Sequence, residues 1–289
     1  TNIPAVDPAV GEIAWGPSGS YAVHDLRVYD GKVYSCIKEY TATAASPTPP
    51  NDSQHWLFKE PTNRMAPFDE YLYTKARRLQ EVKYVIQPGF FNGIWLGGLS
   101  ADTVEYIVRD SPGGNIIYQG SQGMFEQAYG EWEYLFGNLR LETKFSKSSI
   151  PIAPGAVLEI RLLRNNPDVY AEVGTIAIGQ WREIRAPRRN ISATEYGTEV
   201  TPKSYSYFKR NDDGTYTRLA GRQAKTITAK CLIDSRDAPH VTDLLQRILD
   251  IPVVVEASNL PKYGHISTYG FVTGTVVARS WGYSEVNLK

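Results

Sequence analysis

Short runs of alternating apolar and polar residues dominate the chain, and the clearest of them lies near the N-terminus. Leu26–Tyr29 and Lys32–Ile37 each have the pattern of a strand, and Asp30-Gly31 lies between them. A two-residue Asp-Gly connection between strand patterns is typical of a tight β-hairpin. The pattern therefore predicts a hairpin over residues 26–37. Residues 1–20, rich in Pro and Gly, are expected to form an extended arm that ends in turns.

Residues 81–181 continue with many short strand patterns separated by turn residues. Alternation of apolar with polar or charged residues predicts a half-buried strand. The expected strands are Val82–Ile86, Val104–Arg109, Ile116–Tyr118, Val157–Leu162 and Ala171–Trp181. Closely spaced short strands of this kind indicate an antiparallel β-sandwich, similar to a jelly roll.

The last third of the chain combines strand patterns with one helix pattern. Asp237-Ala238-Pro239 supplies a cap and a first-turn proline, and apolar residues then recur at helical spacing until Asp250. Strands are expected on both sides of this helix, at Ser204–Arg210, Thr215–Leu219, Lys225–Ile233, Val253–Val255, Gly270–Ala278 and Tyr283–Leu288. The pattern predicts an α+β domain in which a sheet packs against one helix.

These patterns predict a mainly β protein of three parts. Residues 1–62 form a small aromatic module, residues 63–183 a β-sandwich, and residues 184–289 the α+β domain. A length of 289 residues suits two or three domains, since domains commonly contain roughly 100 to 150 residues.

The junction between the first two parts, Trp56–Asp69, does not have the composition of a flexible linker. Four large apolar residues surround its polar ones, and Pro61 and Pro67 each fix φ and remove a backbone donor. The segment is expected to be an ordered interdomain hinge in which Arg64 pairs with Asp69 or a nearby carboxylate. The hinge residues expected from the sequence are Asn63, Arg64, Phe68 and Asp69.

Charge and cysteine content narrow the function classes. The chain has 31 basic and 31 acidic residues, and this balance argues against a nucleic-acid or membrane-surface partner. Cys36 and Cys231 each lie in a strand pattern and are expected to be buried and reduced, as in a protein made in a cytoplasm. No run approaches the roughly 20 apolar residues of a membrane span, and the N-terminal residues T-N-I-P-A-V-D lack the basic and apolar regions of a signal peptide.

Residues 13–60 contain the spacing W…Y-x-x-x-D-x-x-V-x-D-G-K-V-Y…P-P…W. This spacing resembles the small chitin- and cellulose-binding modules that are attached to glycosidases and phage tail proteins. In those modules exposed aromatic rings stack on sugars, and the resemblance implies that Trp15, Tyr34 and Trp56 carry binding here. The alternative interpretation is that these rings form the module's own small core, because Trp and Tyr are more often buried than displayed.

The sequence carries no recognisable catalytic or metal-binding motif. The four histidines, His24, His55, His240 and His265, match no ligand spacing, and no nucleophile elbow, phosphate-binding loop or dinucleotide fingerprint occurs. Glu131 and Glu133 flank Trp132 and would share one face if the segment is a strand. Paired carboxylates can hydrolyse a glycosidic bond, although two same-face glutamates more often belong to a solvated strand. No enzyme activity, cofactor or metal is expected.

One basic cluster occurs at the start of the last part. Arg182, Arg185, Arg188 and Arg189 fall within ten residues of Trp181. A nucleic-acid surface would need more basic residues, interleaved with exposed aromatics. These arginines are expected to be solvated or to pair with carboxylates of a neighbouring subunit, because Arg suits interface ion pairs.

Three features resemble the tail-tip and baseplate proteins of tailed bacteriophages. The first is the junction P-T-N-R-x-A-x-F-D after a small aromatic module, and the second is the strand V-G-T-x-x-I-G at the end of the sandwich. The third is the β-rich layout with one packing helix, which is similar to the domains that build tail tubes and distal-tail rings.

The resemblance implies a structural subunit of a phage tail tip or baseplate that assembles with copies of itself and with other tail proteins. Its expected location is the virion tail, and host-surface polysaccharide is a further expected partner. Two alternatives remain: a free-standing carbohydrate-binding protein whose sandwich holds the sugar, and a polysaccharide-degrading enzyme that uses Glu131 or Glu133.

Overall fold

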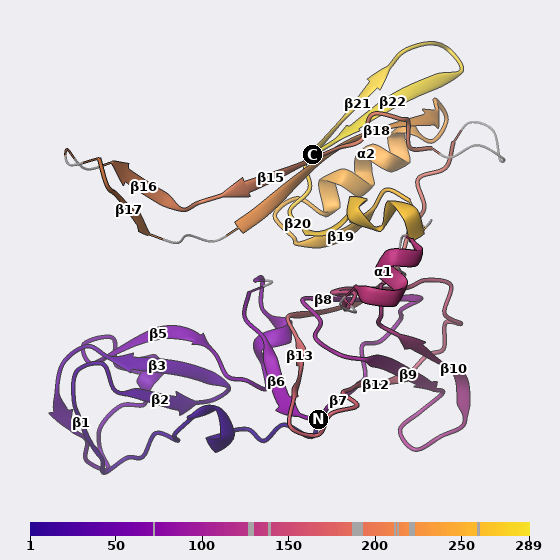
Figure 1. The fold of residues 1–289 in the computed structure, drawn as a ribbon. Helices are drawn as coiled ribbons and strands as arrows, with labels where there is room; N and C mark the ends of the chain where they lie inside the picture. Colours follow the sequence, from indigo (N-terminus) through magenta and orange to yellow (C-terminus); the bar gives the residue numbers. More distant parts are fainter. Residues whose placement is uncertain are drawn as a thin grey trace. The chain divides into compact units, whose positions relative to one another are not determined.

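The computed structural model confirms a mainly β fold built from antiparallel sheets and two α-helices among the residues it describes. Those residues are 1–71, 73–126, 130–137, 140–186, 193–210, 212, 214–219, 223–258 and 261–289. They form two compact units, Thr1–Trp181 and Arg182–Lys289. Figure 1 shows the ribbon of each unit. The predicted division into three parts stays a prediction.

The aromatic module (residues 1–62) contains the predicted hairpin. Asp30 and Gly31 have φ of 47° and 70°, so both central residues adopt the left-handed backbone of a type I′ turn. A third strand completes this sheet in the order β2-β3-β5, and β1 pairs with β4. The strands are β1 (Ser20–Tyr21), β2 (Leu26–Tyr29), β3 (Lys32–Cys36), β4 (Tyr40–Thr41) and β5 (Trp56–Pro61), with short 3₁₀ turns η1 (Pro8–Val10) and η2 (Pro49–Asn51).

The rest of the first unit is a β-sandwich. One sheet has the order β10-β9-β12-β7, the second has the order β11-β8-β14, and β13 pairs with β6. Both larger sheets contribute buried residues to one core. The elements are η3 (Ala66–Phe68), β6 (Ala76–Leu79), β7 (Glu81–Ile86), β8 (Gly93–Gly97), β9 (Thr103–Arg109), β10 (Ile116–Gly123), α1 (Glu131–Phe136), β11 (Lys144–Lys147), β12 (Val157–Leu163), β13 (Tyr170–Val173) and β14 (Thr175–Gly179).

The second unit packs a helix against a sheet, as predicted. Its main sheet has the order β15-β18-β22-β21, with smaller pairs β16-β17 and β19-β20. Val241 of α2 lies in the core with Ile233 of β18 and Val286 of β22. The elements are β15 (Glu199–Ser204), β16 (Tyr207–Arg210), β17 (Tyr216–Leu219), β18 (Gln223–Asp234), α2 (Ala238–Arg247), β19 (Val253–Glu256), η4 (Pro261–Ile266), β20 (Ser267–Gly270), β21 (Gly274–Ala278) and β22 (Tyr283–Leu288).

Three local predictions need correction. The run 171–181 is not one strand, because β13 ends at Val173 and β14 pairs with a different strand. The run 270–278 is likewise divided between β20 and β21. The Asp237 side chain makes no capping hydrogen bond, although the helix does begin at Ala238 with a first-turn proline. In each case the residue pattern located the element but not its ends.

Candidate functional sites

The expected sugar platform of the aromatic module does not form a surface. Trp56 and Tyr34 are only 3% and 6% exposed, and both belong to the module's own core. A ring buried to this extent has no free face to stack on a sugar, so these two assignments are corrected to core residues. Trp15 is half-buried and packs edge-on to Tyr29 at 5.7 Å, and its predicted role in binding stays a prediction.

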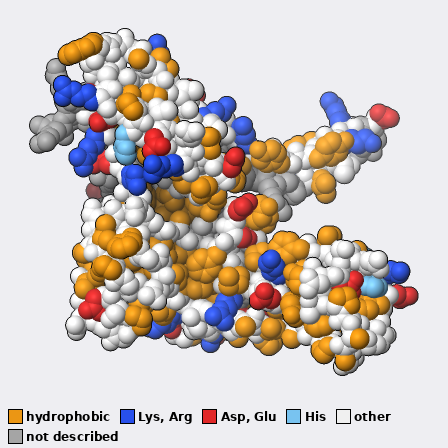
Figure 2. All heavy atoms as spheres, turned by 180° about the vertical axis from the view of Figure 1, so that it is seen from behind, with side chains coloured by type: hydrophobic (Ala, Val, Ile, Leu, Met, Phe, Trp, Pro, Cys, Tyr) orange, Lys and Arg blue, Asp and Glu red, His pale blue; other side chains and the backbone are white. Residues whose placement is uncertain are grey.

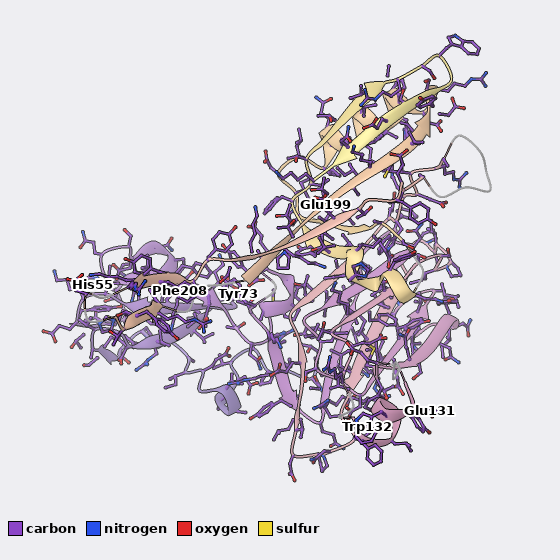
Figure 3. The ribbon with its side chains drawn as sticks, turned by 45° about the horizontal axis from the view of Figure 1, so that its top comes forward. His55, Tyr73, Glu131, Trp132, Glu199 and Phe208 are labelled. Atoms are coloured by element: carbon purple, nitrogen blue, oxygen red, sulfur yellow. The ribbon has the colours of Figure 1, made fainter. Side chains whose placement is uncertain are left out.

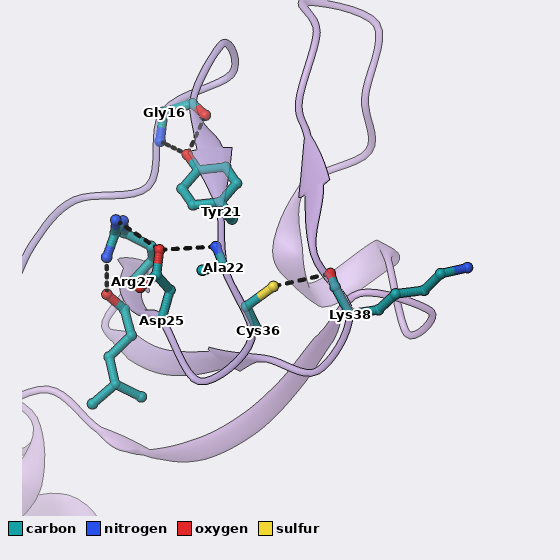
Figure 4. Close-up of polar contacts among 8 residues, drawn as sticks. Gly16, Tyr21, Ala22, Asp25, Arg27, Cys36 and Lys38 are labelled. Carbon is teal, nitrogen blue, oxygen red and sulfur yellow. Dashed lines mark hydrogen bonds and ion pairs between the residues drawn. The ribbon is translucent and has the colours of Figure 1, made fainter.

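The buried rings are held in place by hydrogen bonds as well as by packing. Trp56 Nε1 donates to the Tyr40 hydroxyl at 2.7 Å, and the Tyr21 ring packs edge-on against Trp56 at 5.0 Å. The Tyr21 hydroxyl accepts from the Gly16 amide and donates to the Gly16 carbonyl (Figure 4). Buried aromatic polar groups that find partners in this way specify one packing arrangement.

Both cysteines are buried, as the strand patterns predicted. Cys36 Sγ donates to the Lys38 carbonyl at 3.1 Å (Figure 4), and burial raises the pKa of the Cys36 thiol. Burial likewise raises the pKa of the Cys231 thiol. A raised pKa keeps a thiol protonated and unreactive, so the surroundings of these cysteines suit packing residues better than nucleophiles.

A recess of about 420 Å³ opens on the aromatic module beside the buried rings. The Tyr40 and His55 rings stack at 4.2 Å with an angle of 27° between their planes. His55 Nδ1 lies 2.9 Å from both carboxylate oxygens of Asp52, which is itself buried. Polar side chains complete the lining, which consists of Tyr40, Ser46, Pro47, Asn51, Asp52, Ser53, Gln54 and His55.

The recess combines the two kinds of contact that a sugar ring uses. An aromatic pair offers apolar surface, and hydroxyl, amide and carboxylate groups offer hydrogen bonds that fix orientation. Figure 3 labels His55 on the module. Sequence reasoning missed this site because Tyr40, Asp52 and His55 come together only when β4 and η2 fold. The signal in the sequence was the pairing of Asp52 with His55 three residues later, just before a core Trp.

The junction is ordered by a buried asparagine. Asn63 Nδ2 donates to Asp7 Oδ2 at 2.7 Å, and the Asn63 amide pairs with both backbone groups of Arg77 at 2.8 Å. The Asn63 backbone N–H donates to Glu12 Oε1 at 2.6 Å. The network therefore ties the N-terminal arm and the junction to the first strand of the sandwich, β6. Asn63 was expected from the sequence, whereas Asp7 and Glu12 were not.

The other predicted hinge residues have separate roles. The expected Arg64–Asp69 ion pair is absent among the described residues, because the Asp69 carboxylate accepts from the Tyr71 N–H and the Thr74 hydroxyl. The Arg64 carbonyl accepts from the Tyr84 hydroxyl at 2.9 Å, and Phe68 packs edge-on to the Tyr84 ring at 5.5 Å. These contacts also connect the junction to the sandwich.

The carboxylate pair expected on a strand lies instead in a helix. Glu131 begins α1, a helix of six residues, so the two glutamates at i and i+2 do not share a strand face. The Glu133 side chain is not among those that the structure describes. Trp132 is 77% exposed, and its ring packs against Phe136 at 4.4 Å with a tilt of 43° between the planes. Figure 3 shows Trp132 on the outside of the sandwich. The expected glycosidase pair assumed that both glutamates lie on one strand. The segment is a helix, so the structure does not support that pair.

An arm formed by β16 and β17 carries the largest group of uncovered aromatic residues in the second unit. Every residue of both strands is exposed, and four large apolar side chains of the arm are 59% to 70% exposed. The register places Phe208 and Tyr216 on one face and Tyr207 and Leu219 on the other. Figure 1 shows the arm leading away from α2, and hydrophobic side chains follow it in Figure 2. Neither face of the arm is buried.

The basic cluster is only partly described. Arg182 and Arg185 are exposed, and Arg185 lies 3.5 Å from Glu183 on the surface. Arg188 and Arg189 lie outside the described residues. Their expected contact with a neighbouring subunit stays a prediction.

No group of three or more His, Cys, Asp or Glu side chains in the described ranges could hold a metal ion. None of the helices in the described part of the chain is long and apolar enough to span a membrane. Comparisons of the chain with protein-family models, curated proteins and solved structures each find no match. The tail-protein and carbohydrate-binding resemblances therefore rest on the chain's own motifs.

Proposed function

We propose that this chain is a structural subunit of a bacteriophage tail tip or baseplate and that it assembles with copies of itself. The motif resemblance is the basis for the phage-tail location. The exposed β16-β17 arm is the observation that supports assembly of copies. A two-stranded hairpin is marginally stable in water unless something covers it. Exposed large apolar side chains on both faces mark a surface that a partner covers.

The exposed α1 helix supports the same proposal in the first unit. Trp132, Tyr134, Leu135 and Phe136 are all exposed on one short helix. A helix of six residues has little stability of its own, so its apolar side chains need a neighbour to bury them. Aromatic residues of this kind supply much of the binding energy of protein interfaces. Assembly surfaces on both units suit a subunit that contacts more than one neighbour.

Immunogold electron microscopy tests the location. Antibodies raised against this chain are applied to phage particles from the source culture, with pre-immune antibodies as the control. Gold clustered at the distal end of the tail is the expected result. Particles that carry no gold, with label only on soluble material, would overturn the tail assignment.

A second candidate function is glycan contact through the Tyr40–His55 recess. The stacked rings and the buried Asp52 carboxylate favour this site over the core residues Tyr34 and Trp56. Tyr40→Ala should abolish co-sedimentation with an insoluble polysaccharide such as chitin or cellulose. Phe58→Ala, which removes an exposed ring elsewhere in the module, is the matched control and should bind like the wild type. Equal binding by the Tyr40 variant and the wild type would exclude the recess.

A further inference from the structure

A tryptophan stands at the tip of the turn between β21 and β22, almost completely in solvent. Trp281 is 96% exposed, and hydrogen bonds to Ser280 hold the turn that carries it. The Gly282 and Tyr283 N–H groups both donate to Ser280 Oγ at 3.2 Å, and Ser235 Oγ donates to the Ser280 carbonyl at 3.2 Å. A rigid turn that presents one large ring is well suited to anchor a partner, because little side-chain and backbone freedom remains to be lost on binding.

A cavity of about 160 Å³ opens on the same unit, at the other end of β22. We call it the β20 pocket. Its walls are mostly apolar and include Ile227, Ala229, Val255, Phe271, Val272 and Leu288. An apolar cavity of about 150 Å³ accepts one benzene-sized ring. Phe271 is exposed at the rim, where its ring can meet another aromatic ring edge to face.

Trp281 cannot fill the β20 pocket of its own copy. β22 runs from Tyr283 beside the turn to Leu288 in the pocket wall. Five strand steps span about 17 Å, which is farther than an indole side chain reaches. Trp281 can therefore enter this pocket only from another molecule.

The electrostatics of the two surfaces suit each other. The pocket lining contains Lys225 and Lys289 and no Asp or Glu side chain. The Lys225 ammonium already donates to the His265 and Ser267 carbonyls. Lysine ammonium groups are attracted to the face of an indole ring. Beside Trp281, the Arg279 guanidinium is already paired with Glu285 at 2.8 Å, so its charge is balanced before it approaches the lysines.

We propose that Trp281 of one copy inserts into the β20 pocket of the next copy. The inference rests on the proposed assembly of copies, and it names one contact within it. One tryptophan buries about 150–250 Å², whereas a stable interface needs about 800 Å² per partner. Trp281 is therefore an anchor within a larger contact, to which the exposed arm adds area. The contact is either reciprocal, in a two-fold dimer, or head-to-tail, in a ring or a filament.

The test mixes two complementary variants of the full chain and follows them by sedimentation velocity. Trp281→Ala removes the anchor and leaves the pocket open. Gly270→Trp fills the pocket and leaves the anchor. An added Cβ at Gly270 meets no atom within 4 Å, so the backbone can accept the side chain there. Each variant alone should self-associate about 30-fold more weakly than the wild type. An equimolar mixture should form a one-to-one complex.

A second pair of variants guards against misfolding. Phe271→Ala trims only the exposed rim of the pocket and should also weaken association, whereas Trp281→Phe keeps a ring and should retain part of it. Self-association of Trp281→Ala equal to that of the wild type would overturn the proposal, as would the absence of complex in the mixture. A wild type that stays monomeric would overturn it as well. Gold on the phage tail together with a failed mixture would reject this contact and keep the proposed function.

Discussion

The β2-β3 and β16-β17 hairpins are both rich in aromatic residues, but their surroundings are opposite. β3 pairs with β5, and its Tyr34 and Cys36 are buried in the core of the aromatic module. Within the part of the chain that the structure describes, β16 pairs only with β17, and every residue of both strands is exposed. The hairpin pattern alone therefore does not decide whether a hairpin is buried or exposed. The first hairpin is covered by its own chain, and we propose that the second is covered by another copy.

The largest expected difference comes from removing a buried ring of the first hairpin's core. Trp56→Ala should lower the free energy of unfolding by about 3–5 kcal/mol, because a cavity forms and the Tyr40 hydroxyl loses its donor. Urea unfolding followed by circular dichroism measures this change. Phe208→Ala on the arm is the control and should change stability by less than about 0.5 kcal/mol. Equal losses of unfolding free energy in the two variants would contradict the difference in burial between the two hairpins.

The second prediction concerns the attachment of the first hairpin to the sandwich. Asn63→Ala should lower the free energy of unfolding by about 3 kcal/mol, because the buried Asp7 carboxylate and the backbone groups of Arg77 lose their partners. Asn51→Ala, at an exposed asparagine of the same module, should have little effect. Thermal unfolding compares the two. Matching melting curves would show that the Asn63 network does not hold the junction.

The third prediction concerns the arm. The double variant Phe208→Ser/Tyr216→Ser removes both aromatic residues from one face and should weaken self-association by about 2 kcal/mol, roughly 30-fold. Its melting temperature should match that of the wild type, since neither ring is buried in a single copy. Val23→Ser/Leu57→Ser removes two exposed apolar residues of the aromatic module and serves as the matched control in sedimentation experiments. Normal association of the arm variant would contradict the assignment.

The smallest expected effect depends on pH and lies at the junction. Burial raises the pKa of Tyr84 above its ordinary value near 10. Above about pH 10 the unfolded chain ionises at this position while the folded chain does not, so stability that is complete below pH 10 is lost as pH rises. Tyr84→Phe removes this loss, which is about 1.4 kcal/mol per pH unit.

At pH 8 the same variant lacks the hydrogen bond to the Arg64 carbonyl and should be less stable by about 1 kcal/mol. The deficit should therefore shrink or reverse by pH 11. Tyr196→Phe, at a fully exposed tyrosine, should track the wild type at every pH. A deficit for Tyr84→Phe that is constant with pH would show that the phenol does not remain neutral in the folded state.

Local signals explain which parts of the fold could be predicted. The Asp30-Gly31 turn and the helical spacing after Asp237 are short-range patterns, and both elements formed where expected. Whether a strand is exposed depends on which other segments pack against it, so a short-range pattern does not predict it. β3 and β16 each combine aromatic with polar residues, and β3 is a core strand in which β5 pairs along the second edge. The strand expected over 171–181 changes sheets after Val173, which depends on partners far along the chain.

The candidate sites were harder to predict for the same reason. The recess unites Tyr40 with Asp52 and His55, and the Asn63 network reaches back more than 50 residues to Asp7. Only the Asp52–His55 pair is local in sequence, and the other residues of both sets come together when the chain folds. Trp281 could have been noticed, because a tryptophan beside a glycine between two predicted strands lies in a turn, where no sheet of its own can cover it.

Hydrogen–deuterium exchange of the full chain at low and high concentration tests the central claim most directly. If another copy covers the arm, the β16 and β17 amides should exchange more slowly as concentration rises, and the Phe208→Ser/Tyr216→Ser variant should lose that protection. Amides of β22, a central strand of its sheet, serve as the internal reference for a folded unit. Fast exchange of the arm at every concentration, with β22 protected throughout, would contradict the account.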